Sequence, residues 1–176
     1  MKTSDKGIAF IAQWEGFSST AYMDDNDGWT IGYGHLILPS ESHLITATLT
    51  KEQALILKKK DAGIAEAAIR GQVRAPLSQN QFDALVSLIF NIGSGQFSGS
   101  TAKKRINAYD TKENITEAWQ RWNKDDGKVV QGLVNRRKAE TDLFYSDEEK
   151  KKLITGGIIV LAIVVTLILY WIYNRK

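Results

Sequence analysis

Two carboxylates and a hydroxyl near the start of the chain could together cut a glycosidic bond. Glu15 follows an apolar stretch, Asp24 begins an Asp-rich segment, and Thr30 comes shortly after it. Glycoside hydrolysis needs a protonated carboxyl that donates to the leaving oxygen and an ionised carboxylate that assists water or stabilises positive charge. Partial burial at the negative end of a helix favours the protonated form of Glu15, and wetter surroundings suit Asp24 as the ionised group. The Thr30 hydroxyl can hold a water by donating and accepting hydrogen bonds.

These residues also have a non-catalytic explanation, because Glu before Gly often ends a helix and Asp-rich segments are often solvated turns. The spacing favours catalysis. Eight residues separate Glu15 from Asp24, five separate Asp24 from Thr30, and Thr30 opens the run Thr-Ile-Gly-Tyr-Gly-His. This pattern resembles the bacteriophage-type lysozymes of glycoside hydrolase family 24, the muramidase endolysins, whose catalytic Glu, Asp and Thr are spaced in this way.

Further motifs extend the resemblance over roughly residues 6–145. They are the run Phe-Asn-Ile-Gly-Ser-Gly-Gln-Phe from Phe90, the helix start Ser100-Thr101, and the run from Gly132 to Glu140 before Leu143-Phe144. The resemblance implies an endolysin that hydrolyses the β-1,4 bond between N-acetylmuramic acid and N-acetylglucosamine of bacterial peptidoglycan, for host cell lysis. No cofactor is implied, since acid-base hydrolysis needs only carboxyls and water, and the Asp-rich segment lacks the ligand spacing of a calcium loop.

The resemblance also assigns roles to the three catalytic candidates. Glu15 would be the general acid, and Asp24 and Thr30 would position the attacking water, with inversion at the anomeric carbon. Stereochemistry itself is not readable from sequence, because the separation of the two carboxyls in space decides whether a water fits between them.

Substrate binding is expected around the same motifs, at Tyr33, Gly34, Leu36, Phe90 and Asn91. Glycine in a strand usually marks a bulge or a close backbone approach, which suits the floor of a sugar-binding cleft. Phe90 and Asn91 are carried over from the family resemblance. These five residues are therefore predicted to contact the saccharide.

His35 is predicted to be structural rather than catalytic, because a neutral imidazole ring readily fills two hydrogen-bond roles. The family resemblance suggests Asp61 on the following helix as its partner. The basic residues 58–60 are interpreted as a solvated face, and 136–137 as a solvated cap. Contact of either group with the anionic cell wall is the alternative.

The hydrophobic patterns predict a predominantly helical α+β protein. Helices are expected over 4–14, 50–70, 78–92, 100–109, 113–123 and 130–145, with a small antiparallel sheet over 17–38 that turns at Asp27-Gly28. In the family, the helix over 50–70 bridges two lobes, so a two-lobed lysozyme-like fold is expected. Trp119 and Trp122 share a helical face and favour core packing over a carbohydrate platform.

Composition restricts the class of protein further. There is no cysteine, so the fold cannot depend on disulfides, and the first residues show no secretory signal pattern. The net charge is only +3, and Arg175 and Lys176 contribute two of those charges. This near-balance of charge argues against a nucleic-acid-binding protein, which normally has a marked basic excess.

The C-terminal part predicts a membrane anchor. Every residue from Leu153 to Tyr173 is uncharged, and a helix of this length would measure about 31 Å, which matches the bilayer hydrocarbon. Lysines precede the run, and Tyr170, Trp171 and Tyr173 form an aromatic belt. The expected organisation is a catalytic domain (1–146), a charged linker (147–152), a transmembrane helix (153–173) and a short basic tail (174–176).

The flanking charges lean toward a single-pass protein of the host inner membrane whose enzyme domain is cytoplasmic until release. A separate holin-type membrane protein is the expected partner for release. Two other classes stay open at this point: a membrane-disrupting protein in which the C-terminal helix is the active element, and a membrane-tethered, non-catalytic wall-binding protein.

Overall fold

The computed structural model describes residues 1–24, 28–148 and 154. The chain divides into two units, Met1–Phe144 and Tyr145–Lys176, and the first contains every predicted site residue. Among the described residues, no helix is long and apolar enough to cross a membrane. Apart from Ile154, the predicted membrane segment 153–173 lies outside the described residues.

The first helix ends just before the candidate acid. Helix α1 (Asp5–Ala12) begins after Ser4, whose hydroxyl accepts a hydrogen bond from the Gly7 amide at 3.0 Å. Past its end, the Glu15 amide still donates to the Ala12 carbonyl at 3.1 Å. Glu15 therefore lies three residues past the last residue of α1, which ends two residues before the expected boundary at 14.

A three-stranded antiparallel sheet follows, in the order β1 (Ser18–Asp24), β2 (Gly28–Gly32) and β3 (His35–Leu36). Ile31 of β2 packs with Ile37 and Leu44 in a small hydrophobic core beneath it. Leu44 belongs to a 3-10 helix, η1 (Pro39–Thr46), that the sequence pattern did not predict. The residues of the turn between β1 and β2, 25–27, are outside the described part of the chain.

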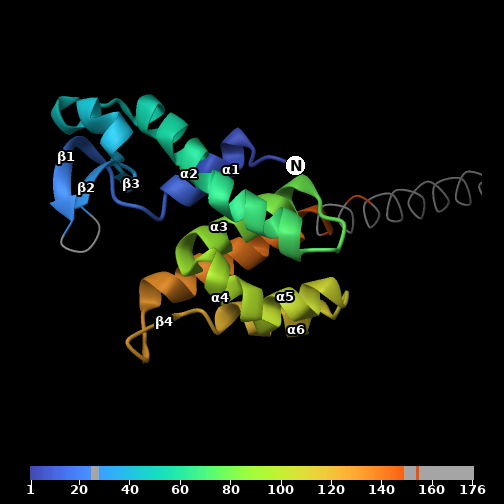
Figure 1. Ribbon diagram of the computed structural model, residues 1–176. Helices are drawn as coiled ribbons and strands as arrows, with labels where there is room; N and C mark the ends of the chain where they lie inside the picture. Colours follow the sequence, from blue (N-terminus) through green and yellow to red (C-terminus); the bar gives the residue numbers. More distant parts are fainter. Residues whose placement is uncertain (25–27, 149–153, 155–176) are drawn as a thin grey trace, which may run out of the picture. The chain divides into compact units, whose positions relative to one another are not determined.

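The long helix α2 (Lys51–Gln72) connects the sheet to the remaining helices (Figure 1). Its start carries the predicted capping box: the Thr50 hydroxyl accepts from the Gln53 amide, and the Gln53 side chain accepts from the Thr50 amide. It contacts β2 and β3 as well as α1, α3 (Gln79–Ile92) and α4 (Ser94–Gly99). Helix α2 therefore positions the sheet against the helical part of the molecule.

The helical part continues with α5 (Thr101–Asn107), α6 (Lys112–Gln120), a short hairpin of β4 (Lys124–Asp125) and β5 (Lys128–Val129), and a helix over residues 131–148. Its core includes Phe82, Leu85, Phe97 and Trp119, all nearly or fully buried. The sequence pattern predicted neither α4 nor the β4–β5 hairpin. The expected mostly helical architecture with a small antiparallel sheet is confirmed.

Candidate active site

The Glu15 carboxylate is held by an arginine from the far end of the chain. Arg136 Nη1 donates to Glu15 Oε1 at 3.0 Å, and the Glu15 side chain is 25% exposed. The guanidinium is itself buried and fixed, because its Nε donates to Glu140 Oε1 at 3.2 Å and its Nη2 to the Ser87 carbonyl at 3.4 Å. Glu15 is therefore half-buried beside an immobilised cation.

Glu140 is the centre of a fully buried polar cluster. Its carboxylate accepts hydrogen bonds from Ser87 Oγ at 2.7 Å, Trp119 Nε1 at 2.9 Å and Arg137 Nη2 at 3.1 Å. Arg137 also donates to Asn91 Oδ1 at 2.8 Å. Burial lowers the pKa of Arg137 to about 10, although the negative charge of Glu140 acts to raise it. The Arg137 guanidinium is therefore still charged at neutral pH. Both arginines are buried, and their interpretation as a solvated cap is wrong.

The β1–β2 hairpin brings the other two catalytic candidates to one face of the sheet. Asp24 pairs with Gly28, Tyr22 with Thr30, and Thr30 with Leu36. Since side chains alternate along a strand, Tyr22, Asp24, Thr30 and Leu36 share a face. Thr30 is buried, and its hydroxyl lies within 3.4 Å of the Gly28 carbonyl. Tyr22 was missed from the sequence, although its position two residues before Asp24 places it on this face.

The predicted substrate-binding residues of the β2–β3 turn are accessible to different degrees. Gly34 is exposed with φ +77°, a conformation that favours glycine. Leu36 is 43% exposed, a large apolar side chain left open to solvent. Tyr33 is half-buried, with its ring centroid 5.1 Å from that of Phe17. Leu36, which pairs with Thr30 across β2 and β3, therefore places an accessible apolar group beside it.

Phe90, at the end of α3, lies against an unexpected cation. Lys58 Nζ is 4.2 Å from the centroid of the half-buried Phe90 ring, and Lys58 is only 1% exposed. The other two lysines of this run form ion pairs: Lys59 with Asp5 at 2.7 Å, and Lys60 with Glu41 at 2.5 Å. The interpretation of residues 58–60 as a solvated face is therefore wrong for Lys58.

His35 is buried between two carboxylates. Its Nδ1 lies 2.9 Å from Asp61 Oδ1, so the expected contact is present, and its Nε2 lies 3.1 Å from Glu41 Oε2, a partner not predicted. The hydrogen bond from Lys60, with smaller contributions from Leu38 and His35, lowers the pKa of Glu41 to about 2 despite its partial desolvation. These contacts connect β3, η1 and α2. A structural role for His35 agrees with them and stays a prediction.

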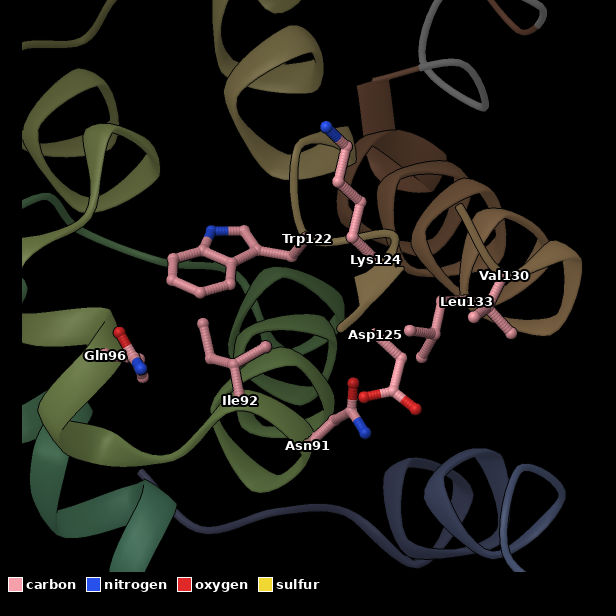
Figure 2. A pocket seen from close by; sticks show the side chains of 8 residues that line it. All are labelled: Asn91, Ile92, Gln96, Trp122, Lys124, Asp125, Val130 and Leu133. Atoms are coloured by element: carbon pink, nitrogen blue, oxygen red, sulfur yellow. The ribbon is translucent and has the colours of Figure 1, made fainter. Parts of the chain in front are cut away.

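Asn91 lines a pocket of about 510 Å³ (Figure 2). The pocket is lined by Asn91, Ile92, Gln96, Trp122, Lys124, Asp125, Val130 and Leu133. Trp122 therefore lines this pocket, whereas Trp119 is buried in the hydrophobic core. The interpretation of both tryptophans as core residues is right for Trp119. Among the described residues, no group of three or more His, Cys, Asp or Glu is placed to hold a metal ion.

Comparison with known proteins connects this geometry to one family, phage lysozyme, which matches residues 12–140. The chain is 40% identical over 147 residues to the endolysin of Salmonella phage P22, covering 83% of this chain and 99% of that protein. It is 30% identical over 129 residues to the SAR-endolysin of Enterobacteria phage P21, covering 73% and 76%.

A solved structure agrees with these sequence matches. The crystal structure of a point mutant of P22 lysozyme superposes with a TM-score of 0.71 at 38% identity, covering 82% of this chain and 98% of that one. The family match spans the candidate acid, the β1–β2 hairpin and the arginine pair alike. The chain therefore belongs to the phage lysozyme family.

Proposed function

We infer that the chain is an endolysin: a glycoside hydrolase that cuts the β-1,4 bond between N-acetylmuramic acid and N-acetylglucosamine of peptidoglycan and lyses the host cell. The observation that carries this function is the phage lysozyme match over residues 12–140, which includes Glu15, Asp24 and Thr30. The spacing of these residues further supports placing the enzyme in glycoside hydrolase family 24.

In the mechanism that we propose, Glu15 donates a proton to the leaving oxygen. Asp24 and Thr30 hold a water that attacks the anomeric carbon from the opposite side, with inversion. Support comes from the strand register, which puts Asp24 and Thr30 on one sheet face, and from Arg136, which holds the Glu15 carboxyl in place. The acid thus follows α1, whereas the water-positioning groups come from the β1–β2 hairpin. Inversion requires that a water fit between the two carboxyls.

The saccharide is proposed to contact Tyr33, Gly34 and Leu36 on one side, and Phe90 and Asn91 on the other. The exposure of Leu36 and Gly34 supports the first group. The second group is supported by Asn91, which is exposed yet oriented by a buried guanidinium at 2.8 Å. A fixed amide of this kind can discriminate polar groups on a sugar, because its hydrogen-bond geometry is set before binding.

Turbidity clearing of purified peptidoglycan tests the catalytic assignment. Glu15→Gln keeps the shape of the side chain but removes the transferable proton, so we expect the rate to fall by about 10³-fold or more. Glu113→Gln makes the same chemical change at an exposed position of α6 and should clear like wild type. Full clearing by Glu15→Gln would remove the acid role.

Proton NMR of the first-formed reducing end tests the roles of Asp24 and Thr30. An inverted anomer is expected. A retained anomer would overturn the water-positioning roles, because retention requires a covalent or equivalent intermediate on the enzyme.

We also propose that residues 1–146 form the catalytic domain, 147–152 a linker, 153–173 a membrane-spanning anchor and 174–176 a basic tail. The uncharged run of 21 residues with its aromatic and basic flanks supports the anchor. The similarity to a SAR-endolysin further supports membrane association. The anchor would hold a cytoplasmic enzyme domain at the host inner membrane until a holin-type protein opens a path to the wall.

A further inference from the structure

Lys58 of α2 is buried without a hydrogen-bond acceptor. It is only 1% exposed, and no described residue accepts a hydrogen bond from its ammonium. Lysine is almost never buried so fully unless another group pairs with it. The next two lysines are exposed and yet each has a carboxylate partner, Asp5 for Lys59 and Glu41 for Lys60. Lys58 is left with three N–H donors and no acceptor in the part of the chain that the structure describes.

The ammonium does contact an aromatic ring. Lys58 Nζ lies 4.2 Å from the centroid of the Phe90 ring. A cation–π contact offsets part of the cost of removing a charge from water, but it supplies no oxygen acceptor. Burial is the largest influence on the pKa of Lys58 and lowers it, the negative charges of Glu15 and Asp61 act to raise it, and Arg136 lowers it. The protein alone therefore compensates this charge only in part.

The backbone at Gly34 leaves space beside the ammonium. A Cβ built on Gly34 would lie 3.9 Å from Lys58 Nζ, and apart from the two chain neighbours of Gly34 no other described atom comes within 4 Å of that point. Gly34 itself is exposed. A longer side chain at this position would cover the ammonium, whereas glycine leaves it within reach of a group that enters from solvent.

The two neighbours of the ammonium belong to the proposed saccharide site. Gly34 follows β2 on one side of that site, and Phe90 lies near the end of α3 on the other. A substituent that suits this position needs an oxygen acceptor for the ammonium and an apolar part for the Phe90 ring. The acetamido groups of N-acetylmuramic acid and N-acetylglucosamine have both, a carbonyl oxygen and a methyl group.

We propose that Lys58 is a substrate-contacting residue: its ammonium donates a hydrogen bond to an acetamido carbonyl of the saccharide and makes the enzyme selective for N-acetylated peptidoglycan. This inference rests on the proposed function, the hydrolysis of peptidoglycan. A glycan with a free amine in place of the acetamide offers no carbonyl, so the buried donor stays unpaired. When that amine is protonated, it also brings a second positive charge toward a buried cation.

Clearing of three peptidoglycan preparations by the full-length wild type tests the selectivity. The first is native, the second is enzymatically de-N-acetylated, and the third is de-N-acetylated and then re-acetylated with acetic anhydride. We expect the second to be cleared at least about tenfold more slowly than the first, because a hydrogen bond from a charged donor is lost, and the third to recover. Native peptidoglycan treated with acetic anhydride corrects for the acetylation of other amines. Equal rates on the native and de-N-acetylated walls would overturn the proposal.

Lys58→Met tests whether this side chain causes the selectivity, because it removes the charge and keeps the unbranched stem. We expect its clearing rates on native and de-N-acetylated peptidoglycan to differ by less than about threefold. A loss of folded enzyme lowers both rates by the same factor, so the ratio of the rates reports contact with the substrate rather than stability. A ratio as large as that of wild type would exclude a role for Lys58.

The thermal stability of Lys58→Met gives a second test. Replacing a poorly compensated buried charge by an apolar side chain of similar volume is neutral or stabilising. The thermal midpoint of Lys58→Met should therefore equal or exceed that of wild type. A lowered midpoint, or a variant that does not fold, would show that the protein itself uses the charge, and the proposal would fail.

Lys104→Met is the matched control, because it deletes one positive charge at an exposed position of α5. De-N-acetylation adds positive charges to the wall, so the net charge of the enzyme could change the ratio of rates. The ratio for Lys104→Met should equal that of wild type. If it changes as much as the ratio for Lys58→Met, net charge explains the effect and the contact with Lys58 does not.

These outcomes separate the two claims. An enzyme that leaves native peptidoglycan intact contradicts the proposed function. An enzyme that clears native and de-N-acetylated peptidoglycan equally well contradicts only the role of Lys58.

Discussion

Arg136 joins the candidate acid to the buried Glu140 cluster, because one guanidinium donates to both carboxylates. The two residues of the Glu15–Arg136 pair are 121 positions apart, and no local pattern relates them. Adjacent arginines on a helix usually indicate a solvated basic face. Here both are buried because Glu140, one turn further along, compensates them. The catalytic candidates were predictable because Glu15, Asp24 and Thr30 fall in one short motif.

Replacing Arg136 should weaken both stability and activity. Arg136→Met leaves Glu15 without its partner and the Ser87 carbonyl without its donor, so we expect about 2–4 kcal/mol less unfolding free energy. We expect Arg136→Lys to keep the charge but lose about tenfold in clearing rate, because a lysine cannot reach three acceptors at once. Chemical denaturation and turbidity clearing measure the two effects.

Arg121→Met provides the control for that change. Arg121 is 56% exposed and pairs with Glu117, which is also exposed, so its loss should change stability by less than about 1 kcal/mol. A comparable loss in both variants would contradict the special role of Arg136.

At the scale of elements, the helices with local start signals were the predictable ones. Ser4, Thr50, Ser78, Ser100 and Thr111 each accept a hydrogen bond at the start of a helix, and each lies near a predicted boundary. The elements that were missed, α4, η1 and the β4–β5 hairpin, are too short to show a clear hydrophobic period. The hairpin falls between the helices expected over 113–123 and 130–145, where the sequence Asp-Asp-Gly is typical of both a loop and a hairpin turn.

The close contact between β2 and α2 requires a glycine at position 32, because glycine has no side chain. Gly32 has φ +68°, and a Cβ at this position would lie 2.9 Å from the Cβ of Ala54. Gly32→Ala combines a left-handed backbone penalty with overpacking, so we expect about 2–4 kcal/mol less stability. The clearing rate should fall as well, because Thr30 is two residues away on the same strand.

Gly63→Ala is the matched control within α2. No atom lies within 4 Å of a Cβ built at Gly63, and its φ is not positive. Alanine should therefore stabilise the protein by about 0.5–1 kcal/mol through the unfolded chain. Equal thermal midpoints for the two variants would contradict the proposed packing.

Glu41 links η1 to α2 and β3, and its contribution should depend on pH. Its pKa is about 2 in the folded protein, below its ordinary value of 4.5, chiefly because of Lys60. A lowered pKa stabilises the fold above pH 4.5, and this stabilisation is lost as the pH falls toward 2. Glu41→Gln should thus cost about 1 kcal/mol at pH 7.

The difference between wild type and Glu41→Gln should shrink as the pH falls from 4.5 through about 2, where half of the carboxyl is protonated in the folded protein. Urea denaturation at intervals between pH 2 and 7 measures it. A difference that stays constant with pH would show that packing, rather than the charge of Glu41, is responsible.

At the scale of the whole molecule, the chain combines a charge-balanced enzyme with an uncharged C-terminal run. All 20 acidic residues and all but two of the 23 basic residues precede Leu153. Peptidoglycan lies beyond the inner membrane of the host, so a membrane anchor would control when this enzyme reaches its substrate. The proposed anchor rests on sequence composition alone, so an experiment with membranes tests it.

The uncharged run should hold the full-length chain in the membrane fraction of an expressing cell. Val160→Lys combined with Leu167→Lys places two charges near the middle of the run, where each costs about 2.5–3.5 kcal/mol of insertion free energy. We expect the double variant to move from the pellet to the supernatant after ultracentrifugation, with peptidoglycan clearing unchanged. Val160→Leu with Leu167→Ile controls for mutation of the same positions and should stay in the pellet. If the lysine variant also pellets, and alkaline carbonate extracts both variants equally, residues 153–173 do not span the membrane and the anchor must be abandoned.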